Sequence, residues 1–254
     1  MRSSKDSKEY LQKKAKFEKT LTLYGRIVVL EALEDRDILP KKLHMANSNK
    51  EDKNITKILK MAKQKGVEIS YCDKQELSRI SKNSKQDQGV ALDIESQNYS
   101  SVSELAKMDS YTMIALDGIH NPQNLGMIIR SCAASKLDGI ILPKKNSAKI
   151  SPLVIKASAG TLFKIPIYYC DKLDSALKEL DSSIYTLSSH AKMQLSELKK
   201  GSRSIFVLGN ESDGVSKDVE TLATHRVVIP MNRGVESLNV AVTAALIAFM
   251  AHWF

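Results

Sequence analysis

The chain has 254 residues, of which 43% are hydrophobic and 26% charged, so it is long enough for one large or two modest globular domains. Its formal net charge of +9 favours a polyanionic partner such as nucleic acid. The three cysteines, Cys72, Cys132 and Cys170, lie far apart without any C-x-x-C spacing, so neither a zinc site nor a disulfide framework is indicated. A reducing compartment such as the cytoplasm is the simplest setting for them.

The N-terminal part of the chain predicts a basic arm followed by a small α/β domain. Residues 1–20 mix lysines with acidic side chains and lack the apolar core of a secretory signal, so we expect a solvated arm. Alternating helix and strand patterns then predict a domain over residues 21–97. Its expected elements are a helix at Gly25–Leu33, a strand at Lys41–Asn47, a helix at Ile55–Lys65, a strand at Val67–Cys72, a helix at Lys74–Ser81 and a strand at Gly89–Ile94.

A polar, serine-rich stretch at residues 98–109 predicts a linker, and a second α/β domain is expected over residues 110–254. Continuous apolar strands between helices predict a mostly parallel sheet covered on both faces. The expected strands are Tyr111–Leu116, Gly139–Leu142, Ile165–Tyr169, Ile184–Leu187, Ser204–Leu208 and Arg226–Ile229. The expected helices include Leu125–Ser135, Asp174–Leu180 and Lys217–Ala223. No Gly-x-Gly turn follows the first of these strands, which disfavours an ordinary dinucleotide-binding fold.

The first polar motif runs from Asn121 to Arg130, directly after a predicted strand. Asn124 is expected to cap the following helix, and the spacing of Gly126 and Arg130 puts both on one helix face. A glycine there would let another backbone or a nucleotide approach the arginine closely. Taken alone, the motif also fits a capped helix with a surface arginine.

The second motif runs from Leu208 to Gly214 and begins where another predicted strand ends. Gly209 would let a ligand lie against the backbone. Glu211 is of a suitable type to pair with Arg130 and hold its orientation. Taken alone, this motif also fits a strand-to-helix turn with a solvated glutamate.

The third motif runs from Ile229 into an apolar helix expected at Val240–Phe254. Pro230 would end strand pairing and free backbone groups for a ligand. Ser237 is expected to cap the helix, and Ser237 and Asn239 offer a hydroxyl and an amide near the same pocket. The apolar helix is short for a bilayer span, so we expect a core or interface helix and no membrane association.

Together and in this order, the three motifs resemble those of the SpoU (TrmH-like) RNA ribose 2′-O-methyltransferases of the SPOUT superfamily. The resemblance implies an α/β fold with a C-terminal trefoil knot, a homodimer formed through the catalytic domain, S-adenosylmethionine as cofactor and no metal. Tyr24-Gly25, Val29–Leu33 and Asp87–Ala91 resemble the L30e-like substrate-binding domain that precedes the catalytic domain in ribosomal-RNA members. The implied partner is structured RNA, with a guanosine of large-subunit ribosomal RNA favoured and transfer RNA as the alternative.

The resemblance also implies roles for particular residues. Because a guanidinium normally stays protonated, Arg130 would either activate the ribose hydroxyl in an unusual environment or bind phosphate and stabilise the alkoxide. The implied catalytic residues are Asn124, Arg130, Glu211, Ser237 and Asn239. The implied cofactor-binding residues are Leu208, Gly209, Asn210, Glu211, Gly214, Ile229, Met231, Ser237, Leu238 and Asn239. The implied RNA-binding residues are Arg26, Lys156 and Ser158, the last two from an element that resembles the K-x-S-x-G pattern of the family.

The alternative from another functional class is a non-catalytic RNA-binding protein that keeps this fold. The presence of all five implied catalytic residues argues against it.

Overall fold

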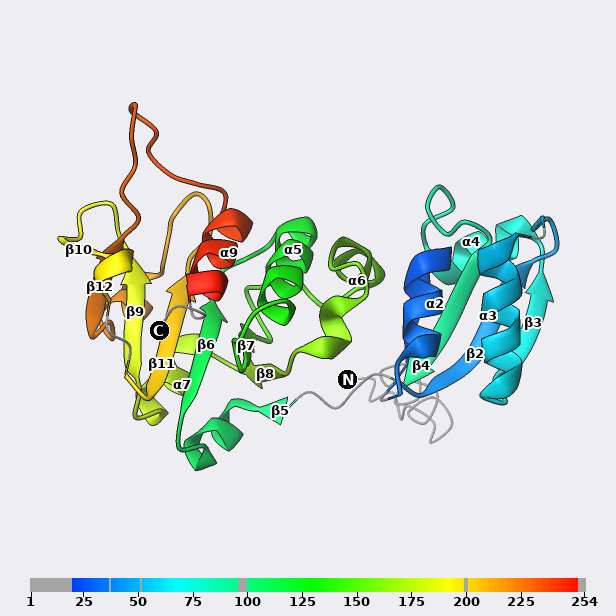
Figure 1. Cartoon of the computed structure of the whole chain (residues 1–254), viewed down its shortest axis with the longest axis horizontal. Helices are drawn as coiled ribbons and strands as arrows, with labels where there is room; N and C mark the ends of the chain where they lie inside the picture. The colour runs from blue at the N-terminus through cyan, green and yellow to red at the C-terminus, as the bar shows by residue number, and fades with distance from the viewer. Residues whose placement is uncertain (1–19, 37, 51, 96–99, 199–200, 251–254) are drawn as a thin grey trace, which may run out of the picture. The chain divides into compact units, whose positions relative to one another are not determined.

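The computed structural model describes residues 20–36, 38–50, 52–95, 100–198 and 201–250. The chain divides into two compact units, residues 1–98 and 99–254, and each is built around its own sheet (Figure 1). Apart from Thr20, the predicted basic arm lies outside the described residues. Among the helices that the structure describes, none combines the length and apolar character that crossing a membrane requires.

The N-terminal unit contains a mixed four-stranded sheet in the order β1-β4-β2-β3. β1 pairs antiparallel with β4, β4 antiparallel with β2, and β2 parallel with β3. The strands are β1 (Thr20–Tyr24), β2 (Pro40–Ala46), β3 (Glu68–Cys72) and β4 (Val90–Glu95), and the helices are α2 (Arg26–Glu34), α3 (Lys53–Gln64) and α4 (Lys74–Ser81). All six predicted elements are present within a few residues, and β1 is an addition, because no element is predicted from sequence before Gly25.

The C-terminal unit contains an eight-stranded sheet in the order β10-β12-β9-β11-β6-β7-β8-β5. Every neighbouring pair is parallel, which confirms the predicted parallel sheet. The strands are β5 (Ser100–Ser101), β6 (Tyr111–Leu116), β7 (Gly139–Pro143), β8 (Ile167–Cys170), β9 (Ser183–Leu187), β10 (Met193–Gln194), β11 (Arg203–Leu208) and β12 (His225–Val228). All residues of β6 and β7 are buried, as expected for central strands covered on both faces.

Helices cover both faces of this sheet. They are α5 (Pro122–Ala133), α6 (Pro152–Ala157), α7 (Leu173–Glu179), α8 (Lys217–Glu220) and α9 (Val240–Met250). Alternate residues of β6, Tyr111, Met113 and Ala115, share one apolar core with residues of α7. α5 lies beside α9 and α6 over the opposite face (Figure 1). The trefoil knot implied by the family resemblance stays a prediction.

The predicted linker is wrong for most of its length. Ser100 and Ser101 form β5, which pairs with β8, and a 3₁₀ helix follows at Val102–Lys107. Val102 and Leu105 are spaced three apart, so one face of this helix is buried in the sheet's core. Polar composition hid this pattern, because the two apolar residues are isolated among serines and charged side chains.

The close packing of α5 against α6 depends on Gly126. An added β-carbon there would lie 2.4 Å from Cβ of Ala157 and 2.7 Å from the carbonyl oxygen of Val154. The glycine therefore admits a neighbouring backbone, which is one of the two uses that the sequence predicts for it.

We expect Gly126→Ala to lower the free energy of unfolding by about 1–3 kcal/mol, because overpacking outweighs the gain in helix propensity. Denaturant unfolding followed by circular dichroism measures the change. Gln123→Ala, at an exposed position of the same helix, is the matched control and should be nearly neutral. A Gly126→Ala variant as stable as the control would contradict the tight contact between α5 and α6.

Candidate active site

The first two motifs leave the sheet at the same edge. β6 and β11 are parallel neighbours whose last residues, Leu116 and Leu208, are paired. The backbone N–H of Asp117 then donates to the carbonyl of Leu208 at 2.8 Å. Because parallel strands end together, motifs more than eighty residues apart begin side by side.

One side chain from each motif meets in a hydrogen-bonded cluster of Asn124, Glu211 and Asn239. Nδ2 of Asn124 donates to Oε1 of Glu211 at 2.6 Å, and Nδ2 of Asn239 donates to the same oxygen at 2.8 Å. Asn239 also donates to Oδ1 of Asn124 at 3.3 Å. Asn124 is buried, whereas Glu211 and Asn239 are exposed at the surface of the cluster. The structure therefore brings together three of the five side chains assigned to catalysis from sequence.

The loop that carries Glu211 is closed by its own polar groups. Asn210 and Gly214 exchange two backbone hydrogen bonds, and Oδ1 of Asn210 accepts from the N–H groups of Ser212 and Asp213. A β-carbon on Gly209 would lie 2.0 Å from the carbonyl carbon of Gly214. Gly209 is thus required for the close approach of this loop's backbone, and its contact with a ligand stays a prediction.

Asp117 holds the Glu211 loop from the opposite side. Its Oδ2 accepts from the N–H of Ser216 at 2.7 Å, and only 9% of the residue is exposed. Sequence analysis missed this role, although a carboxylate placed directly after a buried strand was a usable signal.

Both predicted helix caps are wrong. In α5 the cap is Asn121, whose side chain accepts from the N–H of Gln123 at 2.8 Å, while Asn124 lies within the helix. Pro122 explains this, because proline favours the first helical position and leaves the residue before it as the cap. In α9, Oδ1 of Asn239 accepts from the N–H of Ala241 at 2.9 Å, so Asn239 fills the position expected for Ser237.

The third motif reaches the cluster through an extended segment between β12 and α9, drawn in orange in Figure 1. Ile229, Met231 and Leu238 are half-buried in this segment, and Ser237 is exposed. Among the described residues, the segment makes one internal backbone hydrogen bond, from the N–H of Val235 to the carbonyl of Asn232. Most of its backbone donors and acceptors are therefore available to a ligand.

Arg130 does not join the cluster. It follows Asn124 by six residues, which turns its side chain about 240° around the helix axis. In the described part of the chain it forms no ion pair with Glu211, so the predicted pair is not present within one chain. Arg130 lies instead on the exposed face of α5 that also carries Met127.

This exposed face of α5 adjoins an apolar face of α9. Val242, Leu246 and Phe249 recur at helical spacing on α9 and are each more than 40% exposed, as is Met127. We call these four residues the apolar patch. Since α5 and α9 pack together, Arg130 and the patch belong to neighbouring helix surfaces.

The other residues assigned to RNA binding lie elsewhere. Ser158 is fully buried and donates to the carbonyl of Ile155 at 2.8 Å, so it supports the turn after α6 and has no surface for RNA. Lys156 is half-buried at the end of α6. Arg26 belongs to the N-terminal unit, where it forms an ion pair with Asp52.

The cysteines of the C-terminal unit are not suited to nucleophilic catalysis. Burial raises the pKa of the Cys132 thiol to about 12 and that of Cys170 to about 11, so both stay protonated at neutral pH. The cluster itself consists of two amides and one carboxylate. Such a site can orient two bound reactants by hydrogen bonding. Its side chains include no thiol, hydroxyl or amine nucleophile suited to covalent catalysis.

We expect Asp117→Ala to speed amide hydrogen exchange across residues 209–216 and to lower the free energy of unfolding by about 1–3 kcal/mol, because the N–H of Ser216 loses a charged acceptor. Asp117→Asn keeps an acceptor oxygen and should retain most of the protection. If Asp117→Ala left exchange in this loop unchanged, the hydrogen bond would not be what holds it.

The comparisons with known proteins agree with the geometry. The model of the SpoU rRNA Methylase family matches residues 111–249, and the model for RNA 2′-O ribose methyltransferase substrate binding matches residues 22–100. A tRNA/rRNA methyltransferase of Mycobacterium leprae is 32% identical over 91% of this chain and 76% of its own length. One from Mycolicibacterium vanbaalenii is 29% identical over 97% of this chain and 80% of its own length.

Solved structures share the fold of both units. An AdoMet-bound rRNA methyltransferase from Sinorhizobium meliloti has a TM-score of 0.76 at 22% identity, and the match covers 95% of this chain and 90% of that one. The SpoU methyltransferase AviRb from Streptomyces viridochromogenes, in complex with AdoMet, has a TM-score of 0.77 at 20% identity, covering 93% and 91%. The predicted family is confirmed, and the chain belongs to the SpoU rRNA methylase family of methyltransferases.

Proposed function

We propose that the protein transfers a methyl group from S-adenosylmethionine to the ribose 2′-hydroxyl of a guanosine in large-subunit ribosomal RNA. The observation that carries the proposal is the cluster of Asn124, Glu211 and Asn239, in which one residue of each motif meets the others. A cluster that shares one carboxylate oxygen fixes the relative positions of the three motif segments.

The residues present fit S-adenosylmethionine. The segment between β12 and α9 has backbone donors and acceptors to spare, which suits the edge of an adenine, and Ile229, Met231 and Leu238 offer apolar contacts beside them. When bound, the cofactor supplies an electrophilic methyl group on a sulfonium. Two solved structures of similar fold are named as AdoMet complexes, which supports this assignment.

Within the site, the cluster is proposed to orient rather than to react. Oε1 of Glu211 accepts from two amides, and Oε2 has no partner among the described residues. The carboxylate is thereby aimed, with one oxygen left to accept from a ligand group. Ser237 lies exposed two residues before Asn239, where its hydroxyl can bind the same ligand.

Arg130 is proposed to act in the site of a second subunit. It faces away from the cluster of its own chain, on the helix surface next to the apolar patch. A twofold pairing of this surface would cover Met127, Val242, Leu246 and Phe249 and carry each arginine toward the other chain. There the guanidinium would bind the phosphate beside the target ribose and stabilise the emerging alkoxide.

Ribosomal RNA is favoured over transfer RNA because the family model that matches the C-terminal unit is described as an rRNA methylase. The N-terminal unit matches a model for RNA substrate binding and belongs to the more basic half of the chain, which suits either RNA. The curated relatives are named for both kinds of RNA, so transfer RNA is the alternative substrate. A non-catalytic RNA-binding protein would bind RNA without transferring methyl groups.

We expect Arg130→Ala to reduce methyl incorporation into ribosomal RNA by about 10²–10³-fold, because a positioned charge is lost at the reacting oxygen. Binding of S-adenosylmethionine, measured by calorimetry, should be unchanged. The matched control is Lys136→Ala, which removes an exposed positive charge just beyond α5. Equal incorporation by wild type and Arg130→Ala would remove Arg130 from the mechanism, and wild type that binds no cofactor would leave only the RNA-binding alternative.

Mapping 2′-O-methylated positions in a deletion strain identifies the RNA.

We also expect two inactive variants to restore activity when mixed. In dimers that pair Arg130→Ala with Glu211→Ala, one of the two sites has both an intact cluster and an arginine from the other chain, so random exchange should recover about a quarter of wild-type activity. Leu246→Glu, which charges the apolar patch, should give a monomer in light scattering. Absence of recovery in a mixture shown to contain mixed dimers would assign Arg130 to its own chain.

A further inference from the structure

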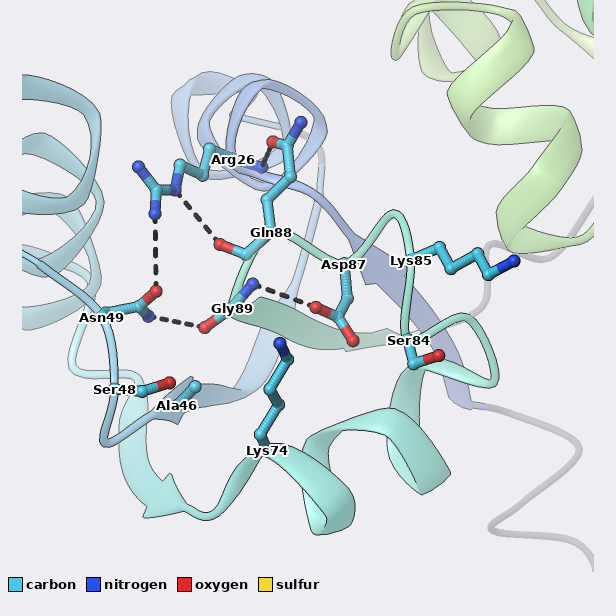
Figure 2. A pocket seen from close by; sticks show the side chains of 10 residues that line it. All are labelled: Arg26, Ala46, Ser48, Asn49, Lys74, Ser84, Lys85, Asp87, Gln88 and Gly89. Carbon is cyan, nitrogen blue, oxygen red and sulfur yellow. Dashed lines mark hydrogen bonds between the residues drawn. The ribbon is translucent and has the colours of Figure 1, made fainter.

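The N-terminal unit contains a pocket that none of the catalytic motifs uses. It has a volume of about 570 Å³, within the range of about 300–1,000 Å³ that is typical of small-ligand sites. Its walls come from the first turn of α2, the loop after β2, the start of α4 and the loop before β4 (Figure 2).

One wall is held rigidly by hydrogen bonds between three segments. Nδ2 of Asn49 donates to the carbonyl of Gly89 at 2.6 Å, and Nε of Arg26 donates to the carbonyl of Gln88 at 3.1 Å. Gln88 and Gly89 both have positive φ, and a β-carbon on Gly89 would lie 2.0 Å from Oδ1 of Asn49. The wall therefore depends on a glycine and on the strained backbone of Gln88, which lowers the stability of the folded chain. Such strain is typical of functional sites.

Other lining residues offer donors without protein partners. Lys74, Ser48 and Ser84 are exposed, and in the described part of the chain their side chains form no hydrogen bond or ion pair. In Figure 2 the Lys74 side chain extends from α4 toward Gly89 and Asp87, inside the ring of lining residues, whereas Lys85 points outward at the rim. Lys74 is thus the cation best placed for a ligand within the pocket.

The charge of the lining selects among anions. The lining carries three cations, Arg26, Lys74 and Lys85, and one carboxylate, Asp87, and Arg26 is paired with Asp52 just outside the pocket. Asp87 is 3% exposed and accepts from the N–H of Gly89 at 3.0 Å and from Oγ of Ser81 at 3.1 Å. A carboxylate at the floor disfavours a doubly charged free phosphate, whereas a singly charged phosphodiester is tolerated.

We infer that this pocket binds one unpaired nucleotide of the RNA substrate, with its phosphodiester on Lys74 and its sugar and base among the hydroxyls of Ser48 and Ser84 and the Gln88–Gly89 wall. The volume exceeds what a phosphate alone needs, and unpaired nucleotides are the part of RNA that can enter a pocket. The inference rests on the proposed function, because it takes the substrate to be RNA.

The test is binding of the full chain, without cofactor, to a fluorescein-labelled random-sequence RNA decamer and to a fully paired RNA duplex. Lys74→Ala should weaken binding of the decamer by about three- to tenfold and reduce its salt dependence by about one phosphate contact. Ser48→Phe, which fills the pocket without changing charge, should weaken the decamer similarly. Neither change should alter duplex binding by more than about twofold.

The matched control is Lys63→Ala, which removes an equal charge from the exposed end of α3, outside the pocket lining. The inference is overturned if Lys74→Ala and Lys63→Ala weaken the decamer equally, if Ser48→Phe binds like wild type, or if sodium phosphate at matched ionic strength displaces the decamer. A wild-type protein that transfers no methyl group or binds no cofactor would instead overturn the proposed function. The comparison of RNA binding would still be valid, because that experiment contains no cofactor.

Discussion

One carboxylate oxygen, Oε1 of Glu211, joins segments that are distant in the chain. Its donors, Asn124 and Asn239, lie 87 residues before it and 28 residues after it. This meeting depends on the parallel order of β6 and β11, since parallel strands release their following loops at a common edge. Asp117 then ties the Glu211 loop back to the end of β6, so the same edge both assembles the cluster and limits its movement.

The sheet was predictable because its central strands are continuous apolar runs separated by helical patterns. For the cluster, the sequence predicts which residue types take part but not which contacts they make. Which amide serves as a cap and which binds the carboxylate depends on where each helix begins, and the two wrong assignments have local causes. Pro122 makes Asn121 the cap of α5, and Asn239 both caps α9 and binds Glu211, a double role that spacing cannot reveal.

The sequence already indicates that Arg130 and Asn124 point to different sides of their helix. The predicted pair between Arg130 and Glu211 did not take this into account. Six residues separate Arg130 from Asn124, and helical geometry puts such positions on different sides. The short strand β5 and its 3₁₀ helix were not readable in this way, because two isolated apolar residues give no period. Elements this short are identified by the surface they pack on, which sequence alone does not supply.

The composition of the cluster implies that affinity and chemistry are supplied by different parts of the chain. Two asparagines and one glutamate carry a net negative charge and would repel an RNA backbone if they acted alone. The attraction to phosphates is therefore expected from basic residues outside the cluster, and we propose Arg130 and the lysines of the N-terminal unit for this role. Basic residues outside the cluster can then attract any RNA, while the shape and hydrogen bonding of the cluster select the substrate.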